Sequence, residues 1–263
     1  MKKINVILIA LVFFCVFLKP VMAEKIHVVG TGSGMYLLRD IAEQFNKNNL
    51  DIKIIVPESI GSGGGIKSVG ADQFLIGRVA RDIKEKEKHF NLTYQPFAKL
   101  PVVFFLHRGT GVTDLSPRQI CDIYSGKITN WQEVGGINQK IRIIRREPGD
   151  SSLEVLTASF PGFKDIEITS KSKTTFSDQE TIKLAEKTKG TIAFGTYGDA
   201  IKYDVDILSI NSIKPFDAAY PYTGTIALIY KEKNNIGNIR KFTDFIKTPV
   251  VKDIVKKSGG LPF

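Results

Sequence analysis

Three segments rich in glycine and hydroxyl residues each stand between an apolar run and a helix-forming run, where they could bind an anion. They read GTGSGM from Gly30, SIGSGGGI from Ser59 and REPGDSSL from Arg146. Glycine lets the backbone come close to a ligand, the free N–H groups at a helix start carry partial positive charge, and serine hydroxyls add donors. Together the segments predict an oxyanion site that needs no metal.

The third segment adds a positive charge to these donors. Arg146 ends a strand-like run, and its planar guanidinium can bind two oxygens of one anion. Ser151 and Ser152 follow the turn and would offer hydroxyls and helix-start amides to the same anion. Side chains alternate in direction along a strand, so we expect Arg146 to face the site and Arg145 to face the surface.

The same segment also has the composition of a plain helix start. Ser151 with Glu154 fits a capping box, and Asp150 is itself a good capping residue. Capping and ligand binding are compatible, because one side chain can cap the helix while another faces a cleft. Both interpretations therefore stay open for this segment.

Other site chemistries fit the sequence poorly. GTGSG lacks the spacing of a dinucleotide fingerprint, and GSGGG lacks the lysine of a nucleotide P-loop. His27, His89 and His107 are scattered, so we expect no metal site and no cofactor. A secreted hydrolase with Ser151 or Ser152 as nucleophile would need a base, and no histidine falls within these segments. No lysine-arginine block is interleaved with aromatic residues, which argues against nucleic acid.

The elements that would position these segments alternate between strand and helix. Strand, helix, strand, helix, strand is the order expected from residue 25 to about 77, which is typical of a parallel sheet with helices on its faces. We expect an α/β protein of two lobes. The first lobe would take residues 24–105 plus 218–263, and the second would take 106–217. Ser116 before Pro117 predicts a helix start in the second lobe.

The N-terminus has the pattern of an export signal. Residues 1–23 combine a positive start, a short apolar run from Val6 to Leu18, and small residues before a cleavage point after Ala23. The alternative is an uncleaved anchor. The exported chain would keep one cysteine, Cys121, which we expect to be buried packing. The signal carries three positive charges, so +7 of the formal +10 would remain.

Longer stretches resemble a known family, the phosphate-binding receptors of ABC transporters, over about Lys25 to Phe263. LSPRQICDIYSGKITNWQEVGG from Leu115 is the most specific piece, and Trp131 within it is expected to be packing. VVGTGSG, SIGSGGGIK and GTIAFGTYG fall in the family's order. The resemblance implies the two-lobe type-2 periplasmic binding-protein fold. Each lobe would be a mixed, mainly parallel sheet flanked by helices, with the ligand in the cleft between the lobes.

The resemblance also implies ligand-binding residues, position by position. Ala80 replaces a polar residue of the family's third loop, and Asp150 occupies the place of the first serine of its fourth loop. The residues implied or favoured as ligand contacts are Ser33, Gly34, Ser62, Gly63, Arg81, Arg146, Asp150, Ser151 and Ser152.

Asp150 is an acid in a loop otherwise suited to anions. A carboxylate accepts the proton of a protonated oxyanion and repels a fully deprotonated one such as sulfate. We therefore hypothesise that Asp150 selects monohydrogen phosphate over sulfate. The competing hypothesis is that Asp150 only caps the helix and points away.

The function expected from the residues and the resemblance together is not enzymatic. It is that of an exported, periplasmic solute-binding protein, a monomer, which captures inorganic phosphate between two lobes and delivers it to an ABC permease at the inner membrane. One alternative is the same fold binding another oxyanion or a small phosphorylated or carboxylated solute. More remote alternatives are the secreted phosphoester hydrolase and a regulatory or adhesive role.

Overall fold

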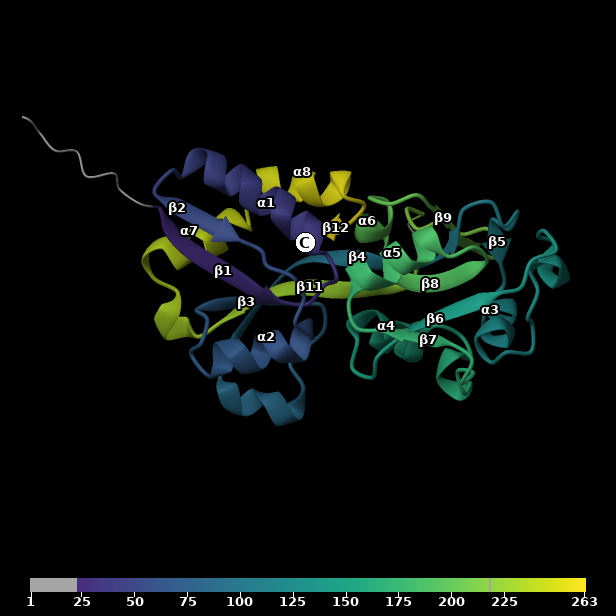
Figure 1. Cartoon of the computed structure of the whole chain (residues 1–263). Coiled ribbons are helices and arrows are strands. Elements are labelled where there is room, and N and C mark those ends of the chain that lie inside the picture. Colours follow the sequence, from purple (N-terminus) through teal and green to yellow (C-terminus); the bar gives the residue numbers. More distant parts are fainter. Residues whose placement is uncertain (1–22, 218) are drawn as a thin grey trace, which may run out of the picture.

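A computed structural model describes residues 23–217 and 219–263, and the expected export signal lies outside the described residues except for Ala23. One sheet runs the length of the molecule, with helices on both of its faces (Figure 1). The fold class expected from the sequence, α/β with a mixed sheet flanked by helices, is confirmed. None of the helices in the described part of the chain is both long enough and apolar enough to cross a bilayer.

The sheet has the strand order β2-β1-β3-β11-β4-β8-β6-β7, and β12 and β9 also pair with β4. The pairs β1–β2, β1–β3, β6–β7 and β6–β8 are parallel, whereas β4 is antiparallel to its neighbours. The strands are β1 (Glu24–Gly30), β2 (Ile52–Ile55), β3 (Ile76–Val79), β4 (Thr93–His107), β5 (Asp114–Leu115), β6 (Arg142–Arg146), β7 (Lys173–Thr175), β8 (Thr191–Thr196), β9 (Val205–Ile207), β10 (Ser209–Ile210), β11 (Thr223–Tyr230) and β12 (Leu261–Pro262).

Helices cover the sheet from above and below in Figure 1, with α1 and α8 on one face and α2 on the other near β1. The α-helices are α1 (Met35–Asn48), α2 (Gly61–Gly70), α3 (Pro117–Tyr124), α4 (Ser151–Ser159), α5 (Asp178–Lys187), α6 (Tyr197–Ala200), α7 (Gly237–Phe245) and α8 (Pro249–Lys257). The short 3₁₀ helices are η1 (Glu85–Phe90), η2 (Trp131–Val134), η3 (Phe163–Asp165) and η4 (Glu232–Asn234).

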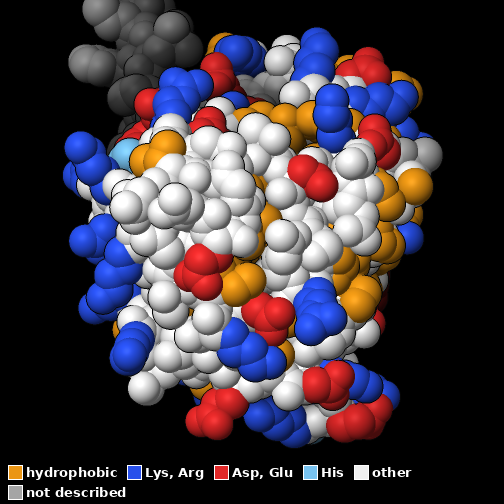
Figure 2. Space-filling view, turned by 90° about the vertical axis from the view of Figure 1, so that its right-hand side faces the viewer, with side chains coloured by type: hydrophobic (Ala, Val, Ile, Leu, Met, Phe, Trp, Pro, Cys, Tyr) orange, Lys and Arg blue, Asp and Glu red, His pale blue; other side chains and the backbone are white. Residues whose placement is uncertain are grey.

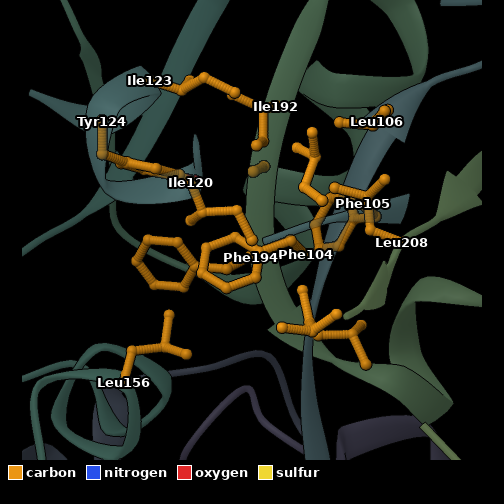
Figure 3. Packing of buried hydrophobic residues seen from close by; sticks show 14 of the residues in the cluster. Phe104, Phe105, Leu106, Ile120, Ile123, Tyr124, Leu156, Ile192, Phe194 and Leu208 are labelled. Carbon is orange, nitrogen blue, oxygen red and sulfur yellow. The ribbon is translucent and has the colours of Figure 1, made fainter. Parts of the chain in front are cut away.

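Buried apolar residues gather in two main clusters along this sheet. The first core contains residues between 26 and 100 and between 226 and 255, and the second core contains residues between 102 and 222. Figure 3 shows part of the second core, where the rings of Phe104 and Phe194 lie 6.1 Å apart between centroids. Strand β4 connects the two cores, because its first part pairs with β11 and its last part with β8.

The outer end of the second core faces the viewer in Figure 2. Lysine, arginine and acidic side chains are scattered there among uncharged ones, and neither sign of charge forms a continuous surface. Mixed charge of this kind keeps a surface soluble and gives little long-range attraction for a polyanion.

Several local predictions are confirmed. Ser116 caps α3 by accepting a hydrogen bond from the Gln119 amide at 3.3 Å, and Pro117 begins that helix. Trp131 is fully buried and its indole N–H donates to the Gly190 carbonyl at 3.0 Å. Cys121 is buried, and burial raises the pKa of its thiol.

The start of α2 differs from the sequence prediction. The segment SIGSGGG was expected to be a break before a helix at Ile66, but α2 already begins at Gly61. Glycine is a poor helix former, and here close packing outweighs that cost. A Cβ on Gly65 would lie 2.8 Å from the Cα of Gly30, so only glycine lets α2 approach the end of β1.

Candidate anion-binding site

A pocket of about 550 Å³ lies between the elements of the two cores, and it is called the cleft pocket below. Its size is within the range of small-ligand sites. The first core contributes the loop after β1, the N-terminal turns of α2 and the segment after β3. The second core contributes the turn between β6 and α4 and the first residue of α5. The lining includes Thr31, Gly32, Ser59, Ser62, Gly63, Arg81, Lys84, Glu87, His89, Arg146, Glu147, Asp150, Ser151 and Asp178.

Arg146 is the buried cation of this pocket. It ends β6 with 4% exposure, whereas the Arg145 side chain turns to the Thr174 hydroxyl, as the alternation along a strand predicted. Its guanidinium lies 3.0 Å from Asp150 and 3.3 Å from Asp178, both of them buried carboxylates. Burial alone would lower the pKa of Arg146, but these two acids raise it above its usual range, so the charge is permanent.

Asp150 caps α4 and at the same time faces Arg146 in the cleft pocket, so it does not point away from the site. Its Oδ1 accepts a hydrogen bond from the Leu153 amide at 2.9 Å and so caps α4, while its Oδ2 contacts Arg146. The capping box expected between Ser151 and Glu154 is therefore wrong, because Asp150 takes the cap position and Glu154 contacts Lys84 instead. Burial and the nearby charge of Asp178 raise the pKa of Asp150 to about 7, against the opposing effect of Arg146.

Serine and threonine hydroxyls converge beside this arginine. The Ser151 hydroxyl lies 3.3 Å from that of Ser33 and 3.5 Å from that of Thr31, which joins the loop after β1 to the start of α4. The Ser152 hydroxyl is buried and has no hydrogen-bond partner among the described residues, although neither Ser152 nor Ser33 lines the cleft pocket itself. Arg146 Nη1 makes no well-aligned hydrogen bond, but it is paired with Oδ2 of Asp178 at 3.3 Å. A buried donor without a partner is costly unless a ligand or water satisfies it.

The remaining predicted residues occupy different surroundings. Ser62 is buried on α2, where its hydroxyl accepts from the Ala80 amide at 3.2 Å, and Gly63 lines the cleft pocket beside it. Arg81 also lines the pocket, but both of its terminal nitrogens donate to Glu87, at 2.7 and 2.8 Å. Although burial opposes it, this bond lowers the pKa of Glu87. Arg81 therefore brings little net charge to the site.

Gly34 lies at the start of α1, and its amide is already bonded. It donates to Oδ2 of Asp199 at 2.7 Å, so an acid from α6 takes the place at this helix start that the sequence assigned to a ligand. Thr196 donates to the same oxygen at 2.6 Å. Burial and the charge of Asp178 raise the pKa of Asp199 to about 7, while the bonds from Thr196 and Gly34 oppose that rise.

Asp178 is the site residue that sequence reasoning missed. It is 1% exposed, and the Ser33 hydroxyl donates to its carboxylate at 3.3 Å. A helix-start signal was present, because Ser177 is followed three residues later by Glu180, and the Ser177 side chain does accept from the Glu180 amide. That signal predicts α5, yet it gives no indication that Asp178 lies next to Arg146.

The site offers hydrogen-bond donors and carboxylates. Across residues 23–217 and 219–263, no group of three or more histidine, cysteine or acidic side chains could hold a metal ion. His89 lines the cleft pocket, but among the described residues it makes no hydrogen bond to Ser151 or Ser152. The geometry can bind a small oxyanion and orient its oxygens.

Comparisons with known proteins give this geometry a context. A family model described as a PBP superfamily domain matches residues 20–249. The phosphate-binding protein PstS of Bacillus subtilis is 28% identical over 249 residues, which cover 90% of this chain and 80% of that protein. The PstS protein of Borreliella burgdorferi is 24% identical over 252 residues, which cover 90% of both chains.

A solved structure extends the comparison to three dimensions. It is of a Clostridium perfringens protein assigned to phosphate ABC transport and solved with bound phosphate. It matches with a TM-score of 0.79 and 26% identity, over 91% of this chain and all of that one. The likeness therefore covers both cores and the cleft pocket between them.

Proposed function

The chain belongs to the PBP superfamily, and on that premise we propose that it is an exported solute-binding protein that captures inorganic phosphate and delivers it to an ABC permease. The curated relatives at 24% and 28% identity are phosphate-binding proteins, and the Clostridium perfringens structure holds phosphate. Those names describe the relatives, and the site residues of this chain supply the independent support. No covalent step is needed for such a role.

The single observation that carries the proposal is the convergence of buried polar groups on the segment from β6 to α4. Arg146 lines the cleft pocket at 4% exposure, and Ser151 lines it as well, with its hydroxyl 3.3 Å from that of Ser33. The next residue, Ser152, has a buried hydroxyl without a hydrogen-bond partner among the described residues. A tetrahedral oxyanion satisfies such a set, because its oxygens accept bonds from several directions at once.

The charges around Arg146 favour a protonated anion. Two buried carboxylates, Asp150 and Asp178, flank one guanidinium, so a fully deprotonated anion would meet net repulsion. A protonated oxyanion can donate its proton to one of them. We assign this role to the ionised form of Asp150, which is populated from about its pKa of 7 upward and would cap α4 with one oxygen while discriminating phosphate from sulfate with the other.

Asp150→Asn tests this selectivity. The amide keeps an oxygen for the cap but loses the negative charge, so we expect the ratio of phosphate to sulfate affinity to fall at least about tenfold. Glu147→Gln is the matched control, because Glu147 also contacts Arg146 but is partly exposed. An unchanged ratio in Asp150→Asn would leave Asp150 with the capping role alone.

Binding would involve two lobes, and we assign residues 24–105 plus 218–263 to the first and 106–217 to the second. The two apolar cores support a division into two lobes, although the second core begins at Val102 and ends at Tyr222, a few residues beyond each of these boundaries. Strands β4 and β11 would be the strands that cross between lobes. Closure around phosphate would exclude water and strengthen each charged hydrogen bond. We propose a periplasmic or extracellular monomer that docks on its permease when closed.

Calorimetric titration of the mature protein, residues 24–263, tests the proposed function. The protein is first unfolded, dialysed and refolded to remove bound anion, and then titrated with phosphate and separately with sulfate at neutral pH. We expect tight binding of phosphate and no heat with sulfate. Folded protein that binds neither anion would refute phosphate capture, and mass spectrometry of the native protein would then identify the ligand that co-purifies.

A further inference from the structure

Arg78 is a second fully buried arginine, and it lies behind the cleft rather than in it. It is on β3 with 0% exposure, and it does not line the cleft pocket. Within residues 23–217 and 219–263, no carboxylate oxygen lies close enough to its guanidinium, 4.0 Å or less, to form an ion pair. By contrast, Arg146 contacts buried acids on two sides.

The partners of Arg78 are backbone carbonyls of the two anion-binding loops. Its Nε donates to the Thr31 carbonyl at 2.7 Å and its Nη2 to the Pro57 carbonyl at 2.8 Å, while its Nη1 donates to the Val28 carbonyl. Thr31 lies in the loop after β1, and Pro57 directly precedes the loop that enters α2. One guanidinium thus holds both loops of the first core.

Arg78 donates to loop carbonyls, which is the kind of contact that an anion-binding loop needs on its far side. A loop whose amides and hydroxyls face an anion turns carbonyls away from it, and those buried carbonyls need donors on the far side. Arg78 supplies such donors in a fixed planar arrangement. Its own backbone carbonyl accepts from the Thr31 amide at 3.2 Å, and a Cβ on Gly30 would lie 1.9 Å from that oxygen. The loop is therefore held to β3 from both sides.

The charge of Arg78 has no ion-pair partner among the described residues, and Asp199 and Glu58 offset the effect of burial on its pKa only in part. Burial lowers its pKa to about 10, so it remains a cation at neutral pH. A buried charge without a counter-ion is expensive, and a nearby anion reduces that cost. An anion in the cleft would lie on the other side of the loops that Arg78 holds.

We infer that Arg78 is a positioning residue for the anion, because its guanidinium holds the first two loops in their binding conformation and its unpaired charge favours an anion in front of them. The inference rests on the proposed function for its choice of ligand. It concerns a residue of β3 that makes no contact with the cleft.

Two substitutions separate the donors from the charge. Arg78→Lys keeps the charge but loses the planar set of donors, and Arg78→Gln keeps a pair of donors but loses the charge. We expect phosphate affinity, measured by calorimetry on folded protein, to fall about 3- to 10-fold in the lysine variant and at least about 30-fold in the glutamine variant. Arg39→Gln is the matched control, because Arg39 donates to the neighbouring Val56 carbonyl but is partly exposed and pairs with Glu58.

Unchanged affinity in Arg78→Lys, or a glutamine variant that binds no more weakly than the lysine variant, would overturn the inference. If Arg78→Gln does not fold, the lysine variant decides the question by itself. Hydrogen exchange in the anion-free protein gives a second measurement. Amides of residues 31–34 and 58–62 should exchange faster in Arg78→Lys than in Arg39→Gln, and equal rates would count against the inference. Wild-type protein that binds no phosphate would refute the proposed function, while the exchange result would still test Arg78.

Discussion

Two pockets of similar volume in this molecule have very different linings. The cleft pocket measures about 550 Å³, and a second pocket of about 750 Å³, the edge pocket, lies on the second core beside β6 and α5. The edge pocket is lined by Ile128, Ile141, Ile143 and Leu184, by threonines, and by the basic residues Lys140, Arg142, Lys171 and Lys173.

The difference lies in the burial of the polar groups. The basic side chains of the edge pocket belong to exposed residues, and water can satisfy them without a ligand. The cleft pocket instead has Arg146 at 4% exposure, paired with buried carboxylates, and the adjoining Ser152 at 1%, with a hydroxyl that no described residue satisfies. Volume and positive charge therefore identify a ligand site less well than buried donors that lack partners do.

The largest expected effect is at Arg146. Arg146→Met should reduce phosphate affinity at least about 100-fold, because it removes the buried cation and leaves Asp150 and Asp178 without their counter-ion. Calorimetry on protein shown to be folded by circular dichroism measures this. Arg145→Met, on the same strand but facing Thr174, should bind within about twofold of wild type. Equal affinities for the two variants would show that the buried position of Arg146 in the cleft pocket does not matter for binding.

The second effect concerns pH, since the cleft pocket contains a buried carboxyl group with a raised pKa. The pKa values of Asp150 and Asp199 are both raised to about 7. The folded protein then holds these protons more tightly than the unfolded chain, so the contribution of these two groups to stability is largest at low pH and is lost as pH rises from about 4 to about 7. We expect a decrease on the order of 4 kcal/mol for each group in the free energy of unfolding of anion-free protein.

Urea unfolding at several pH values measures this decrease. In Asp150→Asn, the free energy of unfolding should fall less between pH 4 and 7, by the contribution of one carboxyl group. In Lys171→Ala, a change in the edge pocket, its pH dependence should be that of the wild type. Stability that rises between pH 4 and 7 in the wild type would contradict the expected direction. It would mean that the unfolded chain binds more protons in this range than the folded protein does.

A smaller loss is expected at Ser152. Ser152→Ala removes one hydroxyl donor without removing charge, so phosphate affinity should fall about tenfold, or about 1.4 kcal/mol. Ser159→Ala on the same helix is the control, because its hydroxyl donates to the Val155 carbonyl at 2.8 Å on the surface. A Ser152 variant that binds like the Ser159 variant would show that the unpartnered hydroxyl does not face the anion.

The smallest effect is expected in the edge pocket. Lys171→Ala combined with Lys173→Ala should change phosphate affinity by less than about twofold and stability by less than about 0.5 kcal/mol, because both residues are exposed. Calorimetry and urea unfolding of the double variant measure these values. A tenfold loss of affinity would mean that surface charge, rather than buried donors, controls capture.

Sequence patterns were sufficient for features that depend on neighbouring residues. The apolar spacing predicts α1, the Ser-Pro pair predicts the start of α3, and strand alternation separates Arg146 from Arg145. These predictions work because the relevant contacts lie within one element or its cap. The resemblance to phosphate-binding receptors extended them to the cleft.

Features that depend on contacts between distant elements were not predictable in this way. Asp178 reaches Ser33 across 145 positions, and Asp199 reaches Gly34 across 165. No local pattern encodes which helix start lies opposite which loop. The predicted start of α2 was wrong for the same reason. The packing of its glycines against β1, rather than their helix propensity, decides the structure.

The bond between Gly34 and Asp199 affects how strongly a ligand can change the population of conformers. It joins an element of the first core to one of the second, and it forms between protein groups alone. If the lobes close as proposed and this bond belongs to the closed arrangement, closure gains part of its free energy before any anion arrives. Each 1.4 kcal/mol gained in this way would raise the ratio of closed to open empty molecules tenfold and so reduce the contrast between empty and loaded states.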